Sequence, residues 1–366
     1  MFDGSAVEKH EEVKNRAHIL VIRFSALGDV AMLVPVVYAL AQQYPDVRIT
    51  VLSRAFARTF FEDIAPNVNF MEADVQGEYR GIKGLNALYR RLVAKQFTHV
   101  ADMHSVLRSH FLRMRFNLGR FRVEHINKNR SLRRQLTDPK NQEKVSLPTP
   151  FENYSEVFAK LGFPIDHVDF TSIFPAEGGN LNMLPRIIGE KRQWEQWIGI
   201  APFAAHQGKI YPVEQMREVI RLIDEKYPHA RIFLFGRGKR EDEVFPQWVK
   251  AFPRCIYVGW HLESMYQELI LMSHLDVMLS MDSANMHMAS LTHIPVVSIW
   301  GATDPKAGFM GFGQSPDNAI FLPMECRPCS IYGQKPCKYG DYHCMTGITP
   351  QQIFDKINSI LKPQEQ

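Results

Sequence analysis

The sequence contains no long uninterrupted apolar run. A helix that crosses a bilayer needs about 18 or more consecutive apolar residues, and no window of this chain approaches that length. The first residues, MFDGSAVEKHEEVKNRA, are charged and include no apolar core, so no secretory signal is expected. Both absences argue against a membrane-spanning or secreted protein and predict a cytoplasmic one.

Cysteine is also scarce, with five residues in a chain of 366. Four of them fall in one stretch, CRPCSIYGQKPCKYGDYHC, at Cys326, Cys329, Cys337 and Cys344. A Cys-x₂-Cys pair with two further cysteines suits a structural zinc site, although the second pair lacks the usual spacing. Free thiols remain an alternative, as does a disulfide, which the cytosol disfavours.

The glycine-rich fingerprint of dinucleotide-binding proteins, GxGxxG, is absent as well. No strand–helix–strand unit carries an acid about twenty residues after such a loop. A nicotinamide-dependent oxidoreductase is therefore a weaker hypothesis.

What the chain does have is an ordinary globular composition, 45% hydrophobic and 22% charged. Its length suggests about two domains of roughly 150 residues each. Strand and helix patterns alternate from residue 19 and again from residue 198, with a break near 175–196. This alternation predicts an α/β protein of two Rossmann-like, doubly wound domains facing a central cleft. The expected ranges are 18–180, 190–347 and a C-terminal helix and tail at 348–366.

In such sheets, ligands bind beyond the carboxyl ends of the strands. The first junction of this kind reads FSALGD, with Asp29 directly after Gly28. As a first-turn acid, Asp29 would stabilise its helix by about 1 kcal/mol. As a general base, it would contribute about 10²- to 10⁴-fold to a reaction rate.

A second junction reads VMLSMDSANMH. Asp282 and Ser283 follow a strand, Ala284 opens a helix, and His287 lies one turn after Ser283 on the same face. Backbone N–H groups at this helix start could hold a phosphate. The alternative is an ordinary cap followed by a core histidine.

Two further loops follow strands in the second half. Lys209, in GKIYP, could reach a diphosphate as a point charge, or it could be a solvated surface lysine. Thr303, in GATDP, offers a hydrogen bond in a loop that could equally be a plain turn.

Taken together, these motifs resemble a known family. RFSALGDVAMLVP, GKIYP, SHLDVMLSMDSANMHMASLTHIPVVSIWGATDP and the late cysteines occur in the order found in the ADP-heptose:lipopolysaccharide heptosyltransferases, glycosyltransferase family 9. The resemblance covers roughly residues 18–362. It implies a GT-B architecture and inverting transfer of heptose from ADP-heptose to a lipopolysaccharide inner-core acceptor. It also implies that the N-terminal domain binds the acceptor and the C-terminal domain binds the nucleotide sugar.

The resemblance also assigns roles to individual residues. Asp29 matches the proposed general base. The donor-binding positions are Lys209, Asp282, Ser283, Ala284, His287 and Thr303, and the acceptor-binding positions are Ser25, Gly28, Asp102, His104 and Arg108. No D-x-D motif occurs in the chain, which fits a donor site that uses lysine and a helix start and requires no metal or other cofactor for catalysis.

Three positions depart from the family pattern. Ala284 stands where glycine is usual, Tyr211 where tryptophan is usual, and Ala302 where proline is usual. These changes affect the identity of the donor more than the reaction class. Transfer from another nucleotide sugar is therefore an alternative.

The charge is unevenly distributed. Residues 108–144 contain eleven Lys or Arg against three acids, a net charge of +8 in a chain of +4. On the acceptor side, this segment would bind an anionic glycolipid and the anionic cytoplasmic face of the inner membrane. A solvated basic face and a non-catalytic binder of anionic lipid are the alternatives. No recognised nucleic-acid motif accompanies the segment, so no nucleic-acid partner is expected.

Overall fold

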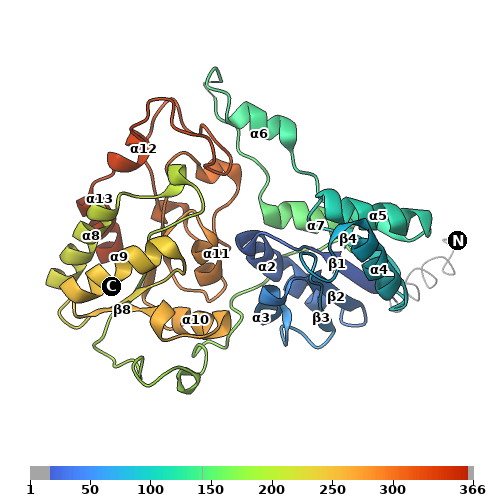
Figure 1. Ribbon diagram of the computed structural model, residues 1–366, viewed down its shortest axis with the longest axis horizontal. Helices are drawn as coiled ribbons and strands as arrows, with labels where there is room; N and C mark the ends of the chain where they lie inside the picture. Colours follow the sequence, from blue (N-terminus) through green and yellow to red (C-terminus); the bar gives the residue numbers. More distant parts are fainter. Residues whose placement is uncertain (1–16, 142, 362–366) are drawn as a thin grey trace, which may run out of the picture. The chain divides into compact units, whose positions relative to one another are not determined.

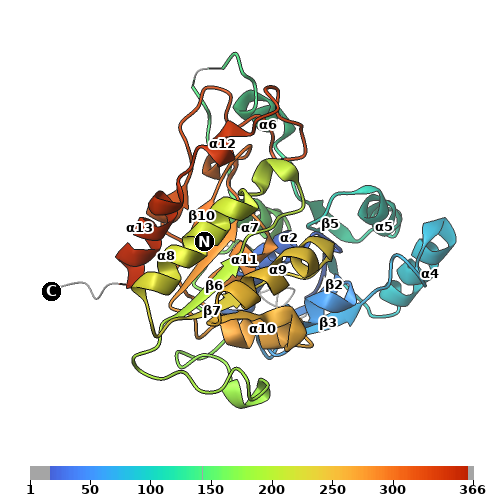
Figure 2. The same cartoon turned by 60° about the vertical axis from the view of Figure 1, so that its left-hand side comes forward.

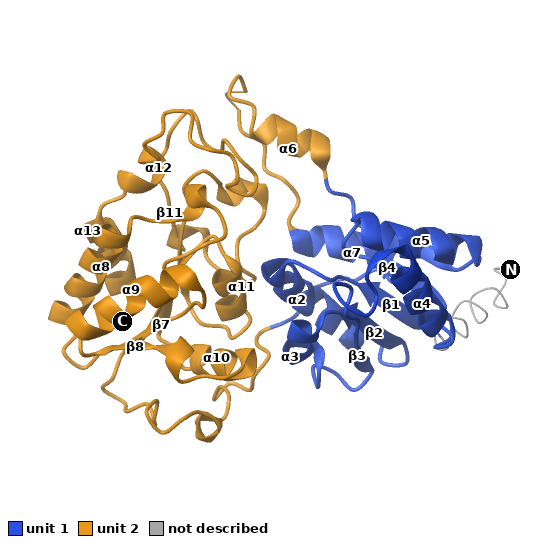
Figure 3. Cartoon of the chain, viewed as in Figure 1, with its two compact units in different colours: residues 1–128, 150–170 blue, residues 129–149, 171–366 orange. Residues whose placement is uncertain are grey.

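The computed structural model describes residues 17–141 and 143–361 (Figure 1). The chain forms two compact units (Figure 3): unit 1 comprises Met1–Lys128 and Pro150–Phe170, and unit 2 comprises Asn129–Thr149 and Thr171–Gln366. The charged start of the chain, on which the expectation of no secretory signal depends, lies outside the described residues. Within the described ranges, no helix combines the length and the hydropathy needed to cross a membrane.

Unit 1 is built on a five-stranded parallel sheet with the strand order β3-β2-β1-β4-β5. Its strands are β1 (His18–Ile22), β2 (Arg48–Ser53), β3 (Val68–Glu72), β4 (His99–Asp102) and β5 (Arg122–His125). Its helices are α2 (Leu27–Gln43), α3 (Arg58–Phe61), α4 (Gly81–Val93), α5 (Leu107–Leu118) and α7 (Pro150–Lys160), with a 3₁₀ turn η1 (Ala55–Ala57). All residues of β1 are buried, as expected for a parallel strand covered on both faces.

Unit 2 is built on a six-stranded parallel sheet with the order β11-β10-β9-β6-β7-β8. Its strands are β6 (Trp197–Ala201), β7 (Arg231–Leu234), β8 (Cys255–Tyr257), β9 (Val277–Met281), β10 (Val296–Ile299) and β11 (Ala319–Ile320). Its helices are α6 (Arg130–Leu136), α8 (Val213–Lys226), α9 (Lys239–Ala251), α10 (Met265–Met272), α11 (Ala284–Ser290), α12 (His343–Thr346) and α13 (Pro350–Leu361). Its 3₁₀ turns are η2 (Leu181–Met183), η3 (Gln207–Lys209), η4 (Val258–Trp260), η5 (Pro305–Ala307) and η6 (Pro316–Asn318).

The strand orders confirm the predicted fold class of two Rossmann-like, doubly wound α/β sheets. In each sheet the strand order reverses once, between β1 and β4 in unit 1 and between β6 and β9 in unit 2. In open α/β sheets, ligands bind at this switch point, beyond the carboxyl ends of the two strands. Each unit therefore offers one preferred place for a ligand.

The units divide the chain differently from the predicted ranges. Residues 129–149 belong to unit 2, where the backbone N–H of Leu147 donates to the Lys306 carbonyl at 2.8 Å. The final helix, α13, is part of the unit 2 core, because Ile353 and Ile357 are fully buried there. These contacts join segments far apart in sequence, which local patterns do not report.

Candidate functional site

The junction after β1 places a carboxylate beside a buried cation. Arg23 directly follows the strand, is buried, and has its Nη2 2.6 Å from Asp29 Oδ2. The same Asp29 oxygen accepts a hydrogen bond from the Ala26 N–H at 3.3 Å. Arg23 also donates to the Met103 carbonyl after β4. The Asp29 side chain is 31% exposed, so the carboxylate is held in place while remaining accessible to a ligand.

The junction after β4 brings His104 to the same place. Asp102 is fully buried, and its Oδ1 accepts the backbone N–H groups of His104 at 3.0 Å and Ser105 at 2.8 Å. The turn that these bonds form puts His104 Nε2 3.2 Å from Ser25 Oγ. The pKa of His104 is lowered to about 3, mainly because the ring is buried and to a smaller extent because of the positive charge of Arg23. The imidazole is therefore neutral and can exchange hydrogen bonds with a hydroxyl group.

The structure thus brings together Ser25, Asp29 and His104 at the β1/β4 switch point. The side-chain hydrogen bonds of Asp102 are made with backbone N–H groups of its own turn. Its other carboxylate oxygen, Oδ2, lies 3.5 Å from Arg113 Nη1. Arg108 is an exposed residue of the first turn of α5.

Sequence reasoning missed two residues of this site. Arg23 left a signal, because it is a cation directly after a buried strand and within the same motif as Asp29. Tyr154 left none, since it comes from α7. Its hydroxyl donates to the Asp29 carbonyl at 3.2 Å, and the Arg23 guanidinium lies 5.8 Å from the centre of its ring.

In unit 2, the two predicted charged residues form an ion pair. Lys209 ends η3, after β6, and its Nζ lies 3.1 Å from Asp282 Oδ2, at the end of β9. Both side chains are mostly buried, at 14% and 5% exposed. The backbone N–H of Asp282 donates to the Ile299 carbonyl at 3.2 Å. The Lys209–Asp282 pair therefore connects the segments that follow β6 and β9, the two strands that flank the switch point.

The remaining predicted donor residues surround this pair. Ser283 precedes α11, and its Oγ lies 3.2 Å from Ser280 Oγ. Ala284 opens the helix, and His287 is buried within it. Thr303 is fully buried, and its Oγ1 has no hydrogen-bond partner among the described residues.

A buried arginine that the sequence did not flag secures the loop after β10. Arg327 is buried and donates from Nη2 to the Thr303 carbonyl at 2.8 Å and from Nε to the Gly301 carbonyl at 2.5 Å. The N–H of Ala302 donates to the Gly208 carbonyl at 2.8 Å. The proline that the resemblance leads us to expect at this position has no N–H to donate. Alanine here therefore allows a bond that ties the loop to the residue before Lys209.

Gly333 packs against the stem of Lys209. Its φ of +77° favours glycine, and a Cβ added there would lie 2.5 Å from Lys209 Cγ. The Gly333 N–H donates to Ser330 Oγ at 3.0 Å, and the Ser330 N–H donates to the Ala302 carbonyl at 3.2 Å. This turn therefore packs against the aliphatic part of Lys209 and helps to hold that side chain in position.

The clustered cysteines are free thiols in this structure. Burial raises the pKa of Cys344 to about 11 and also raises that of Cys329. Among residues 17–141 and 143–361, no three His, Cys, Asp or Glu side chains are grouped as metal ligands would be. The thiols as placed do not fit a tetrahedral zinc site, and zinc binding stays an untested prediction.

The basic segment does not form a single acceptor-side surface. Residues 108–128 lie in unit 1, with six Lys or Arg against one acid, and residues 129–144 lie in unit 2, with five against two. In unit 2, Arg133 donates to the Tyr332 hydroxyl, and its guanidinium lies 5.9 Å from the centre of the Phe309 ring. The basic charge of residues 108–144 is therefore divided between the two units.

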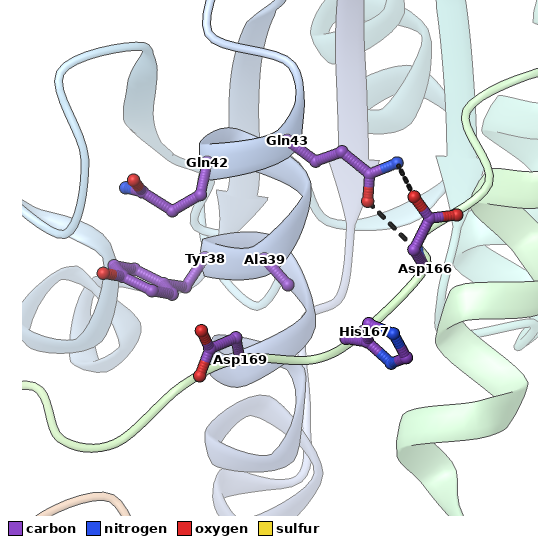
Figure 4. Close-up of a pocket in the computed structure, with 7 residues that line it drawn as sticks. All are labelled: Tyr38, Ala39, Gln42, Gln43, Asp166, His167 and Asp169. Atoms are coloured by element: carbon purple, nitrogen blue, oxygen red, sulfur yellow. Dashed lines mark hydrogen bonds between the residues drawn. The ribbon is translucent and has the colours of Figure 1, made fainter.

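A pocket of about 390 Å³ lies at the other end of α2 (Figure 4). Gln43 Nε2 donates to Asp166 Oδ2 at 3.3 Å, and the Asp166 N–H donates to Gln43 Oε1 at 3.0 Å. His167 and Asp169 complete this side of the pocket. At about 1.5 Å per residue, it lies roughly 20 Å along the helix from Asp29. None of the predicted site residues lines it.

The two Rossmann-like sheets define a GT-B type protein, and the site residues at the two switch points suit a glycosyltransferase. The chain matches the model of glycosyltransferase family 9 (heptosyltransferase) over residues 85–342. It belongs to this family and is a glycosyltransferase, which confirms the resemblance seen in the sequence motifs.

Individual relatives agree with this assignment. The chain is 23% identical over 301 residues to the lipopolysaccharide core heptosyltransferase OpsX of Haemophilus influenzae, covering 78% of this chain and 80% of that protein. Its fold is similar to E. coli ADP-heptose lps heptosyltransferase II, with a TM-score of 0.66, 18% identity, and coverage of 94% of this chain and 98% of that one. It is also similar to E. coli heptosyltransferase WaaC with ADP, with a TM-score of 0.64, 15% identity, and coverage of 94% and 99%.

Proposed function

We propose that this protein transfers heptose from ADP-heptose to a lipopolysaccharide inner-core acceptor, with inversion and without a metal. Unit 1 binds the acceptor, and unit 2 binds the nucleotide sugar. The observation that carries the proposal is the placement of Asp29 at one switch point and of the Lys209–Asp282 pair at the other. The similarity to a lipopolysaccharide core heptosyltransferase and to a heptosyltransferase solved with ADP supports these substrate classes.

Asp29 is the proposed general base. The acceptor hydroxyl attacks the anomeric carbon, its proton passes to the Asp29 carboxylate, and the bond to the diphosphate oxygen breaks with its electron pair leaving on ADP. Arg23, at 2.6 Å, favours the ionised carboxylate and so makes it a weak base. Proton transfer should therefore accompany formation of the new bond rather than precede it. Ser25 and the neutral His104 would hydrogen-bond the acceptor sugar.

Lys209 is the proposed partner of the leaving diphosphate. The phosphate competes with Asp282 for the ammonium group, which frees the Asp282 carboxylate for the hydroxyls of the transferred sugar. Negative charge on the diphosphate grows as the bond to the sugar breaks, so the lysine stabilises the transition state more than the bound donor. Amide groups at 283–285 and the Thr303 hydroxyl would add hydrogen bonds.

Gly333→Ala should weaken ADP binding roughly ten-fold, equivalent to about 1.4 kcal/mol, because the added methyl group displaces the Lys209 stem. Gly340→Ala is the matched control, since its φ is +79° but no atom lies within 4 Å of the added Cβ. Titration calorimetry with ADP compares the two variants. Equal losses in both would mean that backbone strain, and not Lys209, causes the effect.

The donor assignment predicts a nucleotide preference. ADP and ADP-heptose should raise the melting temperature more than UDP, GDP and their sugars, since a ligand at about 100 times its Kd stabilises a protein by about 2.7 kcal/mol. A preference for UDP would favour the alternative of another nucleotide sugar in the same family. NAD(P) should have no effect, and a stabilisation by it would revive the oxidoreductase hypothesis.

Because the acceptor of such a reaction is an anionic glycolipid, we also propose peripheral association with the cytoplasmic face of the inner membrane. The basic residues at 108–128 in unit 1 support this part of the proposal. A purely lipid-binding, non-catalytic role is not favoured, because the chain belongs to an enzyme family.

A further inference from the structure

Two neighbouring helices of unit 1 carry basic residues without any acid. Figures 1 and 2 both place α4 beside α5, where the Tyr89 and Phe116 rings pack with their centres 5.1 Å apart. Residues 80–95 and 107–122 together contain ten Lys or Arg and no Asp or Glu. Among the described residues, only Arg113 of these ten pairs with a carboxylate, that of Asp102. We call the outward side of these two segments the α4–α5 surface.

The same two segments carry exposed large apolar side chains. Leu107 is 90% exposed, Leu118 75%, Ile82 74%, Met114 49% and Val93 37%. In the described part of unit 1, no other large apolar side chain is exposed to this degree. Isolated exposed apolar residues are common on soluble proteins, but confinement to two adjacent helices marks an interaction surface.

The topology relates this surface to the acceptor site. Helices α4 and α5 each lead back from the end of one parallel strand to the start of the next, so they run antiparallel to the sheet. Their first turns, with Ile82 and Leu107, therefore lie at the carboxyl edge of the sheet, where Asp29 and His104 also lie. Packed helices are about 8–10 Å apart, so the two helix starts lie near each other at this edge of the sheet.

We propose that the α4–α5 surface docks on an anionic lipid bilayer, with Ile82 and Leu107 inserted among the headgroups and the surrounding Lys and Arg bound to lipid phosphates. Exposed aliphatic side chains within a basic field suit a membrane interface. A nucleic acid would use the charge but not the aliphatic groups. The proposal depends on the proposed function only for the glycolipid acceptor, whose sugar this docking would bring to the edge that carries Asp29.

The test is sedimentation of the purified full-length protein with vesicles of phosphatidylcholine alone or with added phosphatidylglycerol. Wild type should bind only the anionic vesicles. Ile82→Ser with Leu107→Ser should lower the partition coefficient roughly ten-fold or more. Lys83→Gln with Arg90→Gln should lower it by a similar factor.

The matched controls change exposed residues of unit 2. They are Met183→Ser with Ile187→Ser and Lys226→Gln with Lys250→Gln. Both control variants should bind anionic vesicles as wild type does.

A second readout separates this inference from the proposed function. All variants should transfer sugar normally to a lipid-free acceptor oligosaccharide, while the two α4–α5 variants should lose transfer to acceptor embedded in vesicles. Unchanged vesicle binding in both α4–α5 variants would overturn the inference. The inference would also be overturned if these variants lost binding to single-stranded RNA while their vesicle binding stayed unchanged. If neither wild type nor any variant transfers sugar to any acceptor, the proposed function is wrong. The vesicle binding result would still decide whether the α4–α5 surface docks on the bilayer.

Discussion

Asp29→Asn should lower the turnover number for sugar transfer about 10²- to 10⁴-fold, the usual contribution of a positioned general base. The amide keeps the shape of the carboxylate but cannot take up the proton of the acceptor hydroxyl. The dissociation constant for ADP should not change, because the proposed donor residues belong to unit 2. Single-turnover transfer assays and ADP calorimetry measure the two quantities.

Two further variants make this result interpretable. Asp29→Asn removes the ion pair with the buried Arg23, so the melting temperature of the variant must be compared with that of wild type. Asp29→Glu keeps the charge but shifts it, and should also lose most transfer. Asp46→Asn, an exposed acid just beyond the other end of α2, is the control and should transfer normally. Near-normal turnover of Asp29→Asn would remove Asp29 from the role of base.

Lys209→Gln should lower kcat/KM about 10²- to 10³-fold, the loss typical of removing one group that stabilises developing negative charge. Without the ammonium group, the departing diphosphate carries its charge with less compensation in a mostly buried site. ADP should bind more weakly as well. Steady-state kinetics with varied nucleotide sugar and ADP titration provide the measurements, and Lys250→Gln, an exposed lysine of the same unit, serves as the control.

Asp282→Asn distinguishes the two members of the ion pair. This change frees Lys209 from a carboxylate 3.1 Å away, so ADP alone should bind at least as well as in wild type. Transfer should still fall, because the carboxylate proposed to hold the sugar is lost. If both variants bind ADP as wild type does, the diphosphate is bound elsewhere and the donor assignment is wrong.

Much of the candidate site could be predicted because its residues lie at strand ends. The apolar runs HILVI and VMLS end in the polar stretches that carry Asp29 and Asp282, and this change of pattern is visible within a few residues. The residues that support the site could not be found in this way. Tyr154 contacts Asp29 across 125 positions, and Arg327 holds Thr303 across 24.

The sequence by itself determined the alternation of strands and helices, and with it the junctions where Asp29, Lys209 and Asp282 stand. Apolar periodicity and backbone hydrogen bonding within an element depend on only a few neighbouring residues, so the local pattern is enough. Only the tertiary structure decided that Arg23 pairs with Asp29, that Gly333 packs against Lys209, and that residues 129–149 join unit 2. Burial and ion pairing depend on which distant segments meet, and that follows from the packing of the whole chain.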